Sequence, residues 1–167
     1  MDYKIYPLSD RNEAIVWQML RYAAHENSLE YIKAEPDLAR YAANWGKAGD
    51  FGYVAQSDRH LGAAWVRQWL SEDKGYGWVS DEIPELAIAV LPNYRGLGIG
   101  TQLLTRILAK ARETYSAVSL SVRANNPAVR MYERLGFVKV SGSEITNRLG
   151  EVSFNMICEF DRASAIA

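Results

Sequence analysis

Leu86-Ala-Ile-Ala-Val-Leu-Pro-Asn-Tyr-Arg-Gly-Leu-Gly-Ile-Gly-Thr101 is the stretch that decides the fold of this chain. Its first five residues are apolar and predict a buried strand, which Pro92 and Asn93 end with residues typical of turns. Three glycines follow at alternate positions, and an amphipathic helix begins directly after them. The apolar face of that helix consists of Leu103, Leu104, Ile107, Leu108 and Ala111.

The glycine loop between this strand and this helix has the composition of an anion-binding site. Glycines leave their backbone amides uncovered, and the unpaired N–H groups of a first helical turn point the same way. A hydrogen bond from an amide to a phosphate contributes about 1.5–3 kcal/mol, and the helix dipole adds about 0.3–1 kcal/mol. Several such bonds would hold a pyrophosphate without a lysine, although a glycine-rich turn without a ligand has the same pattern.

Two common phosphate-binding motifs do not fit this loop. A Walker loop requires Gly-Lys-Ser/Thr, whereas Gly100 is followed directly by Thr101. A dinucleotide-binding loop has Gly-x-Gly-x-x-Gly and an acidic residue at the end of the next strand, whereas here that strand ends at Arg123. A nucleotide-binding oxidoreductase therefore remains only as an alternative, which a test of CoA against nicotinamide binding would separate.

Two segments resemble the sequence motifs of the GNAT superfamily of N-acetyltransferases. Arg95-Gly-Leu-Gly98-Ile-Gly100 is similar to the family's Arg/Gln-x-x-Gly-x-Gly/Ala motif. Asn125-Asn-Pro-Ala128-Val-Arg-Met-Tyr132-Glu-Arg-Leu-Gly136-Phe137 is similar to Asn-x-x-Ala-x-x-x-Tyr-x-x-x-Gly-Phe. The resemblance is close from Leu86 to Val140, and before Glu85 it rests only on the general order of elements.

The resemblance implies an acetyl-CoA-dependent N-acetyltransferase. The implied fold is α/β, one GNAT-like domain over residues 1–167, with a mixed, mostly antiparallel sheet flanked by helices and splayed central strands. The acetyl group would pass from acetyl-CoA to a primary amine of a small molecule or a protein by direct attack in a ternary complex. The alternative is a non-catalytic acyl-CoA sensor on the same fold, although a sensor has no use for an acid such as Tyr132.

The same resemblance assigns the residues that would hold acetyl-CoA. The pyrophosphate would bind the loop amides, and the pantetheine arm would pair with the strand backbone much as an added strand would. The Ile88 amide would polarise the thioester carbonyl. Asn125 would hydrogen-bond the pantetheine arm, or else serve as a turn residue before Pro127. The implied cofactor-binding residues are Ile88, Ala89, Val90, Arg95, Gly96, Leu97, Gly98, Ile99, Gly100, Thr101 and Asn125.

Tyr132 is the implied acid for the departing thiol, and its alternative role is a tyrosine packed in a helix. A tyrosine has an ordinary pKa of about 10 and a thiol of about 8.5, so full proton transfer is uphill by about 2 kcal/mol. We therefore expect Tyr132 to donate a hydrogen bond to the nascent thiolate, with complete transfer only if its pKa is lowered.

The candidate general base comes from the acidic stretch 72–85. An alkylamine costs about 4.6 kcal/mol to deprotonate at pH 7, so a positioned base or a water chain is useful. Glu85 is the first choice, although the family's usual glutamate aligns one place earlier, at Pro84, which reverses the strand face unless a bulge intervenes. Otherwise Glu82 or an ordered water takes this role, or the stretch is only a solvated hairpin.

The composition is that of one domain of 167 residues with a net charge of −1. This charge gives no reason to expect a nucleic acid or a membrane as partner, and a homodimer is left open. The only cysteine, Cys158, is expected to be a small buried residue, and a lone thiol suits a reducing compartment such as the cytoplasm.

His25 and His60 lack the spacing of metal ligands, so no metal is expected. No signal peptide or membrane span is expected, and the acceptor amine is undetermined.

Apolar periodicity and turn residues predict the remaining elements. The first helix is expected to be capped by Ser9 or Asp10, and the segments Ser141-Gly-Ser143 and Asn147-Arg-Leu-Gly150 are expected to be loop. The expected strands are Tyr3–Leu8, Tyr53–Gln56, Leu61–Gln68, Ala117–Arg123, Phe137–Val140 and Val152–Phe160. The other expected helices run from Pro36 to a stop at Gly46, from the glycine loop to Glu113, and from Pro127 to Leu135.

Overall fold

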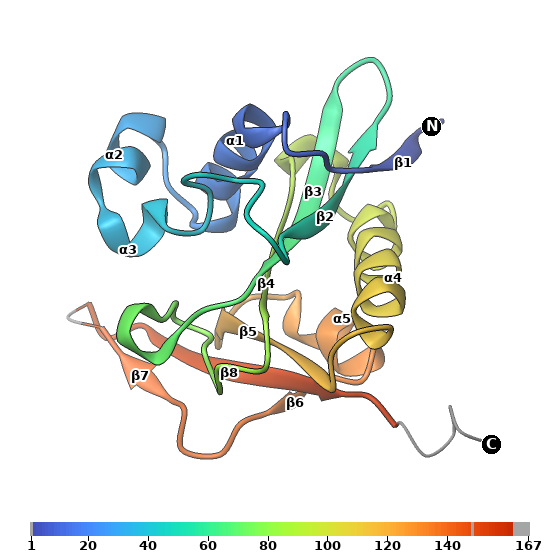
Figure 1. Cartoon of the computed structure of the whole chain (residues 1–167). Coiled ribbons are helices and arrows are strands. Elements are labelled where there is room, and N and C mark those ends of the chain that lie inside the picture. Colours follow the sequence, from blue (N-terminus) through green and yellow to red (C-terminus); the bar gives the residue numbers. More distant parts are fainter. Residues whose placement is uncertain (1, 148, 162–167) are drawn as a thin grey trace. The chain divides into compact units, whose positions relative to one another are not determined.

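The apolar run that opens the glycine stretch forms strand β4 (Glu85–Val90), which passes through both units of the molecule (Figure 1). The structure is a computed structural model that describes residues 2–147 and 149–161. One unit comprises Met1–Arg67 and Ala87–Ile107, and the other comprises Gln68–Leu86 and Leu108–Ala167. We call them unit 1 and unit 2.

Unit 1 is built on a sheet with the strand order β1 (Lys4–Pro7), β2 (Phe51–Gln56), β3 (His60–Arg67) and β4. β1 pairs antiparallel with β2, and β2 pairs antiparallel with β3. Every residue of β3 from Leu61 to Arg67 is buried, because helices cover both faces of the sheet.

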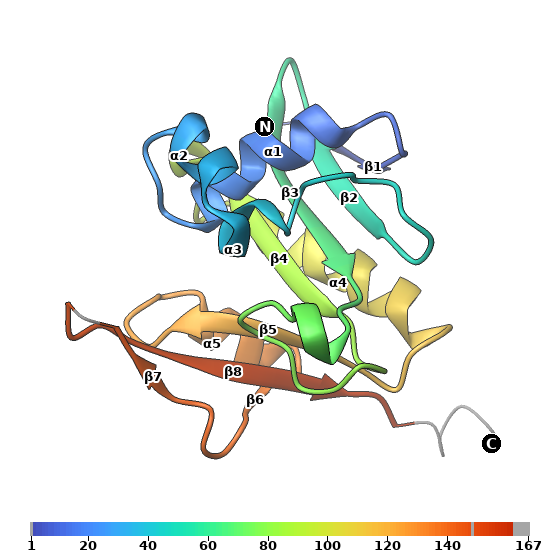
Figure 2. The same ribbon diagram turned by 60° about the vertical axis from the view of Figure 1, so that its left-hand side comes forward.

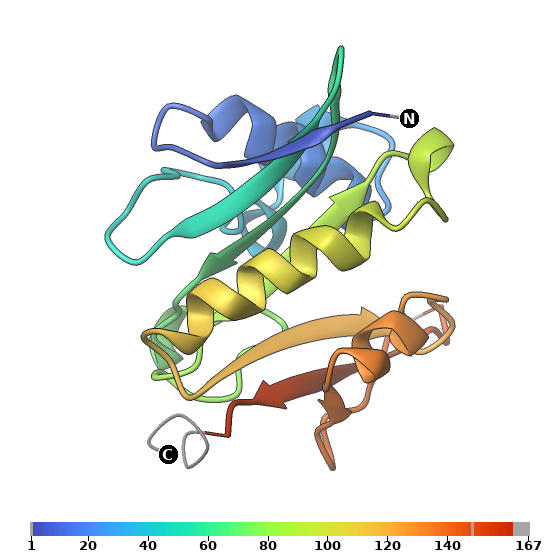
Figure 3. The ribbon, with the colours of Figure 1, turned by 90° about the vertical axis from the view of Figure 1, so that its right-hand side faces the viewer.

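The helices of unit 1 lie in two layers. α1 (Glu13–Ala23), α2 (Leu29–Ala34) and α3 (Pro36–Ala39) lie on one face of the sheet, and the first part of α4 (Ile99–Arg112) lies on the other (Figure 2, Figure 3). The spacing of apolar residues on α1 and α4 turns one face of each helix inward. Fully buried side chains from these helices are Val16, Met19, Ile32, Leu103, Leu104 and Ile107.

Unit 2 is built on the antiparallel pair β5 (Ala117–Arg123) and β8 (Val152–Glu159). The short strands β6 (Val138–Lys139) and β7 (Ile145–Thr146) also pair with β8. β4 begins in this unit and pairs parallel with β5 at Glu85 and Ser119. The link 68–84, which includes the short helix η1 (Ser71–Asp73), and helix α5 (Val129–Arg134) complete the unit.

The expected α/β class, with a mixed and mostly antiparallel sheet flanked by helices, is confirmed. The strands that were expected before residue 140 and β8 are found within two residues of their predicted ends, and β5 matches at both ends. That one domain spans residues 1–167 stays a prediction. Among the described residues, no helix is long and apolar enough to cross a bilayer.

Three expectations about local structure are wrong, and two short elements were not predicted. The cap of α1 is Asn12 rather than Ser9 or Asp10, because Asn12 accepts hydrogen bonds from the Ser9 amide and hydroxyl in a turn before the helix. α5 begins two residues after Pro127, and neither α2 nor β7 was predicted. β7 lies between the two expected loop segments, of which residue 148 is outside the described residues. The helix from Pro36 ends early at Ala39, because the carbonyls of Arg40 and Ala43 bond Arg67 instead of extending it.

Candidate active site

The glycine loop of unit 1 has a backbone shape that only glycine adopts without strain. After the short helix η2 (Pro92–Tyr94), Gly96 and Gly98 have φ angles of +77° and +84°. A Cβ added to either residue would meet no atom within 4 Å. These two glycines are therefore required by the path of the backbone rather than by close packing, and they leave the loop surface open.

The amides of this loop are available to an anion. In the described part of the chain, the amides of residues 96–98 donate no backbone hydrogen bond. The Gln102 amide donates to the Gly98 carbonyl at 3.1 Å, so Gly98 opens α4 and the preceding amides lie at the positive end of its dipole. Arg95 is exposed, and its Nε donates to the Val90 carbonyl at 3.0 Å, which ties the loop to the end of β4. This is the geometry of a phosphate-binding helix N-terminus.

The strand residues expected to bind pantetheine also belong to unit 1. Ile88 and Val90 are half-buried and Ala89 is buried. The Leu91 amide, one residue beyond β4, donates to the Leu61 carbonyl at 2.8 Å. The sequence-predicted sets Ile88–Val90 and Arg95–Thr101 therefore lie on one continuous segment of unit 1.

The candidate acid Tyr132 lies on α5 in unit 2. Its side chain is 6% exposed and its ring meets Phe137 edge to face, with centroids 5.8 Å apart. Burial raises the pKa of Tyr132 to about 12. The structure therefore gives Tyr132 the opposite pKa shift to the one that complete proton transfer to a thiolate would need.

Asn125 follows the end of β5 in unit 2 and lies in the turn that leads to α5. The Ala128 amide donates to Asn126 Oδ1 at 2.9 Å, and the Asn126 amide donates to the Arg123 carbonyl at 3.0 Å. Asn125 itself is exposed. Asn125 is thus a central residue of the turn from Arg123 to Asn126, as its alternative role before Pro127 predicted.

The candidate base Glu85 is buried at the start of β4. Its side chain is 4% exposed, and Oε1 accepts a hydrogen bond from Trp69 Nε1 at 2.7 Å. A Cβ added to Gly77 would lie 2.8 Å from Glu85 Cδ and Oε2, so the link passes directly against the carboxylate. Trp69 and Gly77 were missed by sequence reasoning, and their only signal is a lone tryptophan just before a polar link.

The alternative base Glu82 is exposed and bonds its own turn. Its Oε2 accepts from the Ser80 hydroxyl at 2.8 Å, and its amide donates to Ser80 Oγ at 3.2 Å. Asp81 Oδ1 accepts from Trp78 Nε1 at 2.9 Å. The acidic stretch therefore contains one buried carboxylate, Glu85, and two that bond locally.

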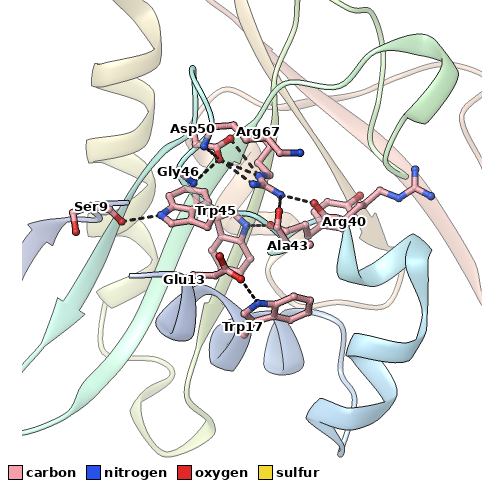
Figure 4. Close-up of polar contacts among 12 residues, drawn as sticks. Ser9, Glu13, Trp17, Arg40, Ala43, Trp45, Gly46, Asp50 and Arg67 are labelled. Carbon is pink, nitrogen blue, oxygen red and sulfur yellow. Dashed lines mark hydrogen bonds and ion pairs between the residues drawn. The ribbon is translucent and has the colours of Figure 1, made fainter. Parts of the chain in front are cut away.

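The segment after α3 in unit 1 is held by a buried ion pair (Figure 4). Arg67 Nη2 donates to Asp50 Oδ2 at 3.0 Å, and both side chains are at most 5% exposed. Asp50 also accepts from the amides of Gly46 and Lys47, while Trp45 Nε1 donates to the Ser9 carbonyl at 2.9 Å. These bonds fix residues 40–50 against β3 and the start of the chain.

Cys158 is a buried residue of β8 in unit 2, as expected from the sequence. Burial raises the pKa of its thiol, and the Arg112 guanidinium partly opposes this shift. No cluster of three histidine, cysteine or acidic side chains able to hold a metal ion occurs within residues 2–147 and 149–161.

Comparison with known families identifies what this arrangement is similar to. The model of the Acetyltransferase (GNAT) family matches residues 14–137. An N-alpha-acetyltransferase of Sulfurisphaera tokodaii is 48% identical over 58 residues, which are 33% of this chain and 35% of that protein. A ribosomal protein bS18-alanine N-acetyltransferase of Haemophilus influenzae is 38% identical over 63 residues, 37% of this chain and 43% of that protein. The chain thus covers less than half the length of these relatives.

Solved structures share the fold at low identity. yncA of Salmonella typhimurium, solved with its cofactor acetyl-CoA, has a TM-score of 0.70 and 19% identity over 96% of this chain and 95% of its own. The ribosomal-protein-S18-alanine N-acetyltransferase of Escherichia coli has a TM-score of 0.66 and 21% identity over 95% of this chain and 94% of its own.

Proposed function

Because this chain belongs to the Acetyltransferase (GNAT) family, we propose that it transfers the acetyl group of acetyl-CoA to a primary amine by direct attack in a ternary complex. The observation that carries the proposal is the loop 95–101, where Gly96 and Gly98 leave the amides open at the start of α4. The presence of acetyl-CoA in the yncA structure supports the same ligand here.

In this proposal acetyl-CoA is held by backbone groups of unit 1. Its pyrophosphate accepts hydrogen bonds from the amides of Arg95–Thr101, each contributing about 1.5–3 kcal/mol. Its pantetheine arm pairs with Ile88–Val90, and the Ile88 amide points at the thioester carbonyl. Because this amide meets more negative charge in the transition state than in the ground state, it accelerates the reaction. The exposed side chain of Asn125 is a further hydrogen-bonding group for the pantetheine arm.

Tyr132 is proposed as a hydrogen-bond donor to the departing CoA thiolate. Its pKa of about 12 lies well above the value of about 8.5 for a thiol, so complete proton transfer would cost about 5 kcal/mol. A hydrogen bond that strengthens as charge develops on sulfur requires no such transfer. We therefore assign Tyr132 this role rather than that of a general acid.

Glu85 is proposed as the group that takes the proton of the acceptor amine. Because its side chain is only 4% exposed, we propose that the proton reaches it through a water molecule rather than by direct contact. Glu82 is the alternative base, since it is exposed and lies in the link just before Glu85. Substituting each by glutamine and comparing the pH dependence of kcat/KM separates the two.

The acceptor that we propose is the α-amino group of a peptide or protein. The curated relatives are named for N-alpha-acetylation and for acetylation of an alanine in a ribosomal protein. An α-amino group has a pKa of about 8, so deprotonation at pH 7 costs about 1.4 kcal/mol, against about 4.6 kcal/mol for an alkylamine. An acceptor that is partly neutral already makes a smaller demand on a buried base such as Glu85.

The test is release of CoA thiol from acetyl-CoA in the presence of matched acceptors. One peptide carries a free N-terminal alanine and no lysine, a second is the same peptide with a blocked N-terminus, and a third is blocked but contains one lysine. A panel of small amines and amino acids covers the other acceptor classes. We expect turnover with the first peptide at least tenfold above the third at neutral pH. Thiol release no faster than the blank with every amine would contradict the catalytic role and favour an acyl-CoA sensor.

The remaining expectations about partners are part of the same proposal. We propose a cytoplasmic protein, with no nucleic-acid or membrane partner, on the basis of the net charge of −1 and the single cysteine. A homodimer stays a prediction that sedimentation would test.

A further inference from the structure

The carboxylate of Glu85 lies against two residues of the link that precedes its strand, Trp69 and Gly77. Trp69 is 7% exposed and donates its indole N–H to Oε1 at 2.7 Å. A bond of this length to a carboxylate is a charge-assisted hydrogen bond. One oxygen of Glu85 is therefore fixed by a rigid ring that is itself buried.

The other oxygen faces the backbone of Gly77. A Cβ at Gly77 would lie 2.8 Å from Oε2 and 2.8 Å from the carbonyl carbon of Leu120, so the link is pressed between the carboxylate and β5. The buried hydroxyl of Ser119 donates to the Gly77 carbonyl at 2.6 Å and holds this part of the link in place. Ser119 is also the register partner of Glu85 across the two strands.

The indole of Trp69 and the backbone of Gly77 thus lie beside Glu85, while the cation of the link, Lys74, lies over the Trp78 ring. The charged residues nearby in the link have partners of their own, since Asp81 accepts from Trp78 and Glu82 accepts from Ser80. Trp78 makes the same type of bond as Trp69, but on the half-exposed part of the link. This gives the chain two tryptophan–carboxylate bonds of the same type, one buried at the candidate base and one on Asp81 in the half-exposed part of the link.

We propose that Trp69 is a positioning residue, which fixes the rotamer of Glu85 and favours its charged, proton-accepting form. This inference rests on the proposed function, because it needs Glu85 to act as the base. A donor to the charged form of a carboxyl favours ionisation, and removing the donor raises the pH at which the base becomes active. Trp69 touches neither substrate in this role and acts only through Glu85.

The first test needs no substrate. In proton–nitrogen NMR spectra at neutral pH, the indole N–H signal of Trp69 should move upfield in Glu85→Gln, because a neutral amide accepts a weaker bond than a carboxylate. The Trp78 signal serves as the internal control and should stay in place. A Trp69 signal that is unchanged in Glu85→Gln would overturn the proposal, and this measurement holds even if a Trp69 variant does not fold.

The second test is the pH profile of kcat/KM with acetyl-CoA and the alanine-initiated peptide. Trp69→Phe keeps an aromatic ring and removes the N–H, so the midpoint of the acid limb should rise by about 1 pH unit and activity should recover at high pH. Trp78→Phe should leave the midpoint in place. A purely structural role for Trp69 would lower the rate equally at every pH and would overturn the inference.

The two proposals fail in different ways. A wild-type profile with an acid limb that Glu85→Gln abolishes, together with an unmoved midpoint in Trp69→Phe, overturns the positioning role alone. A profile that is the same in wild type and Glu85→Gln removes Glu85 as the base, and the positioning role with it. Absence of turnover by the wild-type protein with every acceptor overturns the proposed function itself.

Discussion

At the residue scale, the proposed binding of acetyl-CoA depends on the open space at Gly98. Gly98→Asp places a carboxylate in the loop, where repulsion of a phosphate at about 4 Å costs about 4 kcal/mol, or about 1,000-fold in affinity. The fold should survive, because an added Cβ meets nothing within 4 Å and the φ of +84° costs only about 1–2 kcal/mol for a non-glycine residue. Calorimetric titration with acetyl-CoA measures this loss.

Gly142→Asp is the matched control for the loop variant. Gly142 also has a positive φ, +77°, and open space around it, but it lies in a turn of unit 2. Both variants should lose similar stability, and only Gly98→Asp should lose affinity. Wild-type affinity in a folded Gly98→Asp protein would contradict the phosphate-loop proposal.

The hydroxyl of Tyr132 should act only during the reaction. Tyr132→Phe removes one oxygen, so it should lower kcat about 10-fold or more while the KM for acetyl-CoA stays nearly constant. The reason is that the hydrogen bond strengthens only as the thiolate forms. Steady-state kinetics on both proteins give the answer, and equal kcat values would mean that the hydroxyl takes no part in the chemistry.

Burial of the same hydroxyl predicts a loss of stability at high pH. Folding raises the pKa of Tyr132 from 10.0 to about 12, so the hydroxyl of the unfolded chain deprotonates at a lower pH than that of the folded protein. The free energy of unfolding therefore falls as the pH rises from about 10 to about 12. Wild type should therefore lose about 3 kcal/mol more than Tyr132→Phe across this interval. Urea unfolding of both proteins at pH 9 and 12 measures the difference, and parallel losses would argue against the raised pKa.

At the scale of elements, the buried ion pair of unit 1 holds a segment that has little regular structure. Asp50→Ala leaves the guanidinium of Arg67 buried without its carboxylate, which should cost about 3–5 kcal/mol of unfolding free energy. Asp58→Ala is the control, since its pair with Arg59 is exposed and should contribute less than about 1 kcal/mol. Urea unfolding distinguishes them, and equal small losses would show that the buried pair is not what fixes this segment.

Regular elements were predictable where the apolar pattern is long enough to have a period. α4 and β5 meet that condition, whereas α2, with six residues, and β7, with two, are too short to show a period. The early end of α3 depends on Arg67, which is 24 residues from Ala43 in the chain, and local sequence does not report such a bond. Long-range partners therefore account for the wrong expectation about this helix.

In the candidate site, too, local features were predictable from the sequence and features that depend on distant residues were not. The glycine loop is local and its position follows from the sequence, because its glycines and the helix after them are adjacent. The burial of Glu85 depends on Trp69 and Gly77, which reach it through folding of the link. Burial of Tyr132 likewise depends on packing, so the direction of its pKa shift could not be read from its motif.

For the whole molecule, the proposed residues are distributed over both units. The backbone groups proposed to bind acetyl-CoA belong mainly to unit 1, and Glu85, Asn125 and Tyr132 belong to unit 2. Tests of the activity therefore use the whole chain. At this scale the alternatives also separate, since a nucleotide-binding oxidoreductase would bind a nicotinamide cofactor and a sensor would bind acetyl-CoA without consuming it.

Transfer of an isotopically labelled acetyl group is the decisive test of the proposed acetyltransferase activity. The whole protein is incubated with acetyl-CoA labelled in its acetyl group and the peptide with a free N-terminal alanine, and mass spectrometry follows both products. We expect one labelled acetyl group on the peptide nitrogen for each CoA released, with the blocked peptide unchanged and Gly98→Asp inactive. Acetyl-CoA that stays intact beside a bound, unlabelled peptide, or label transfer that Gly98→Asp leaves at the wild-type rate, would contradict it.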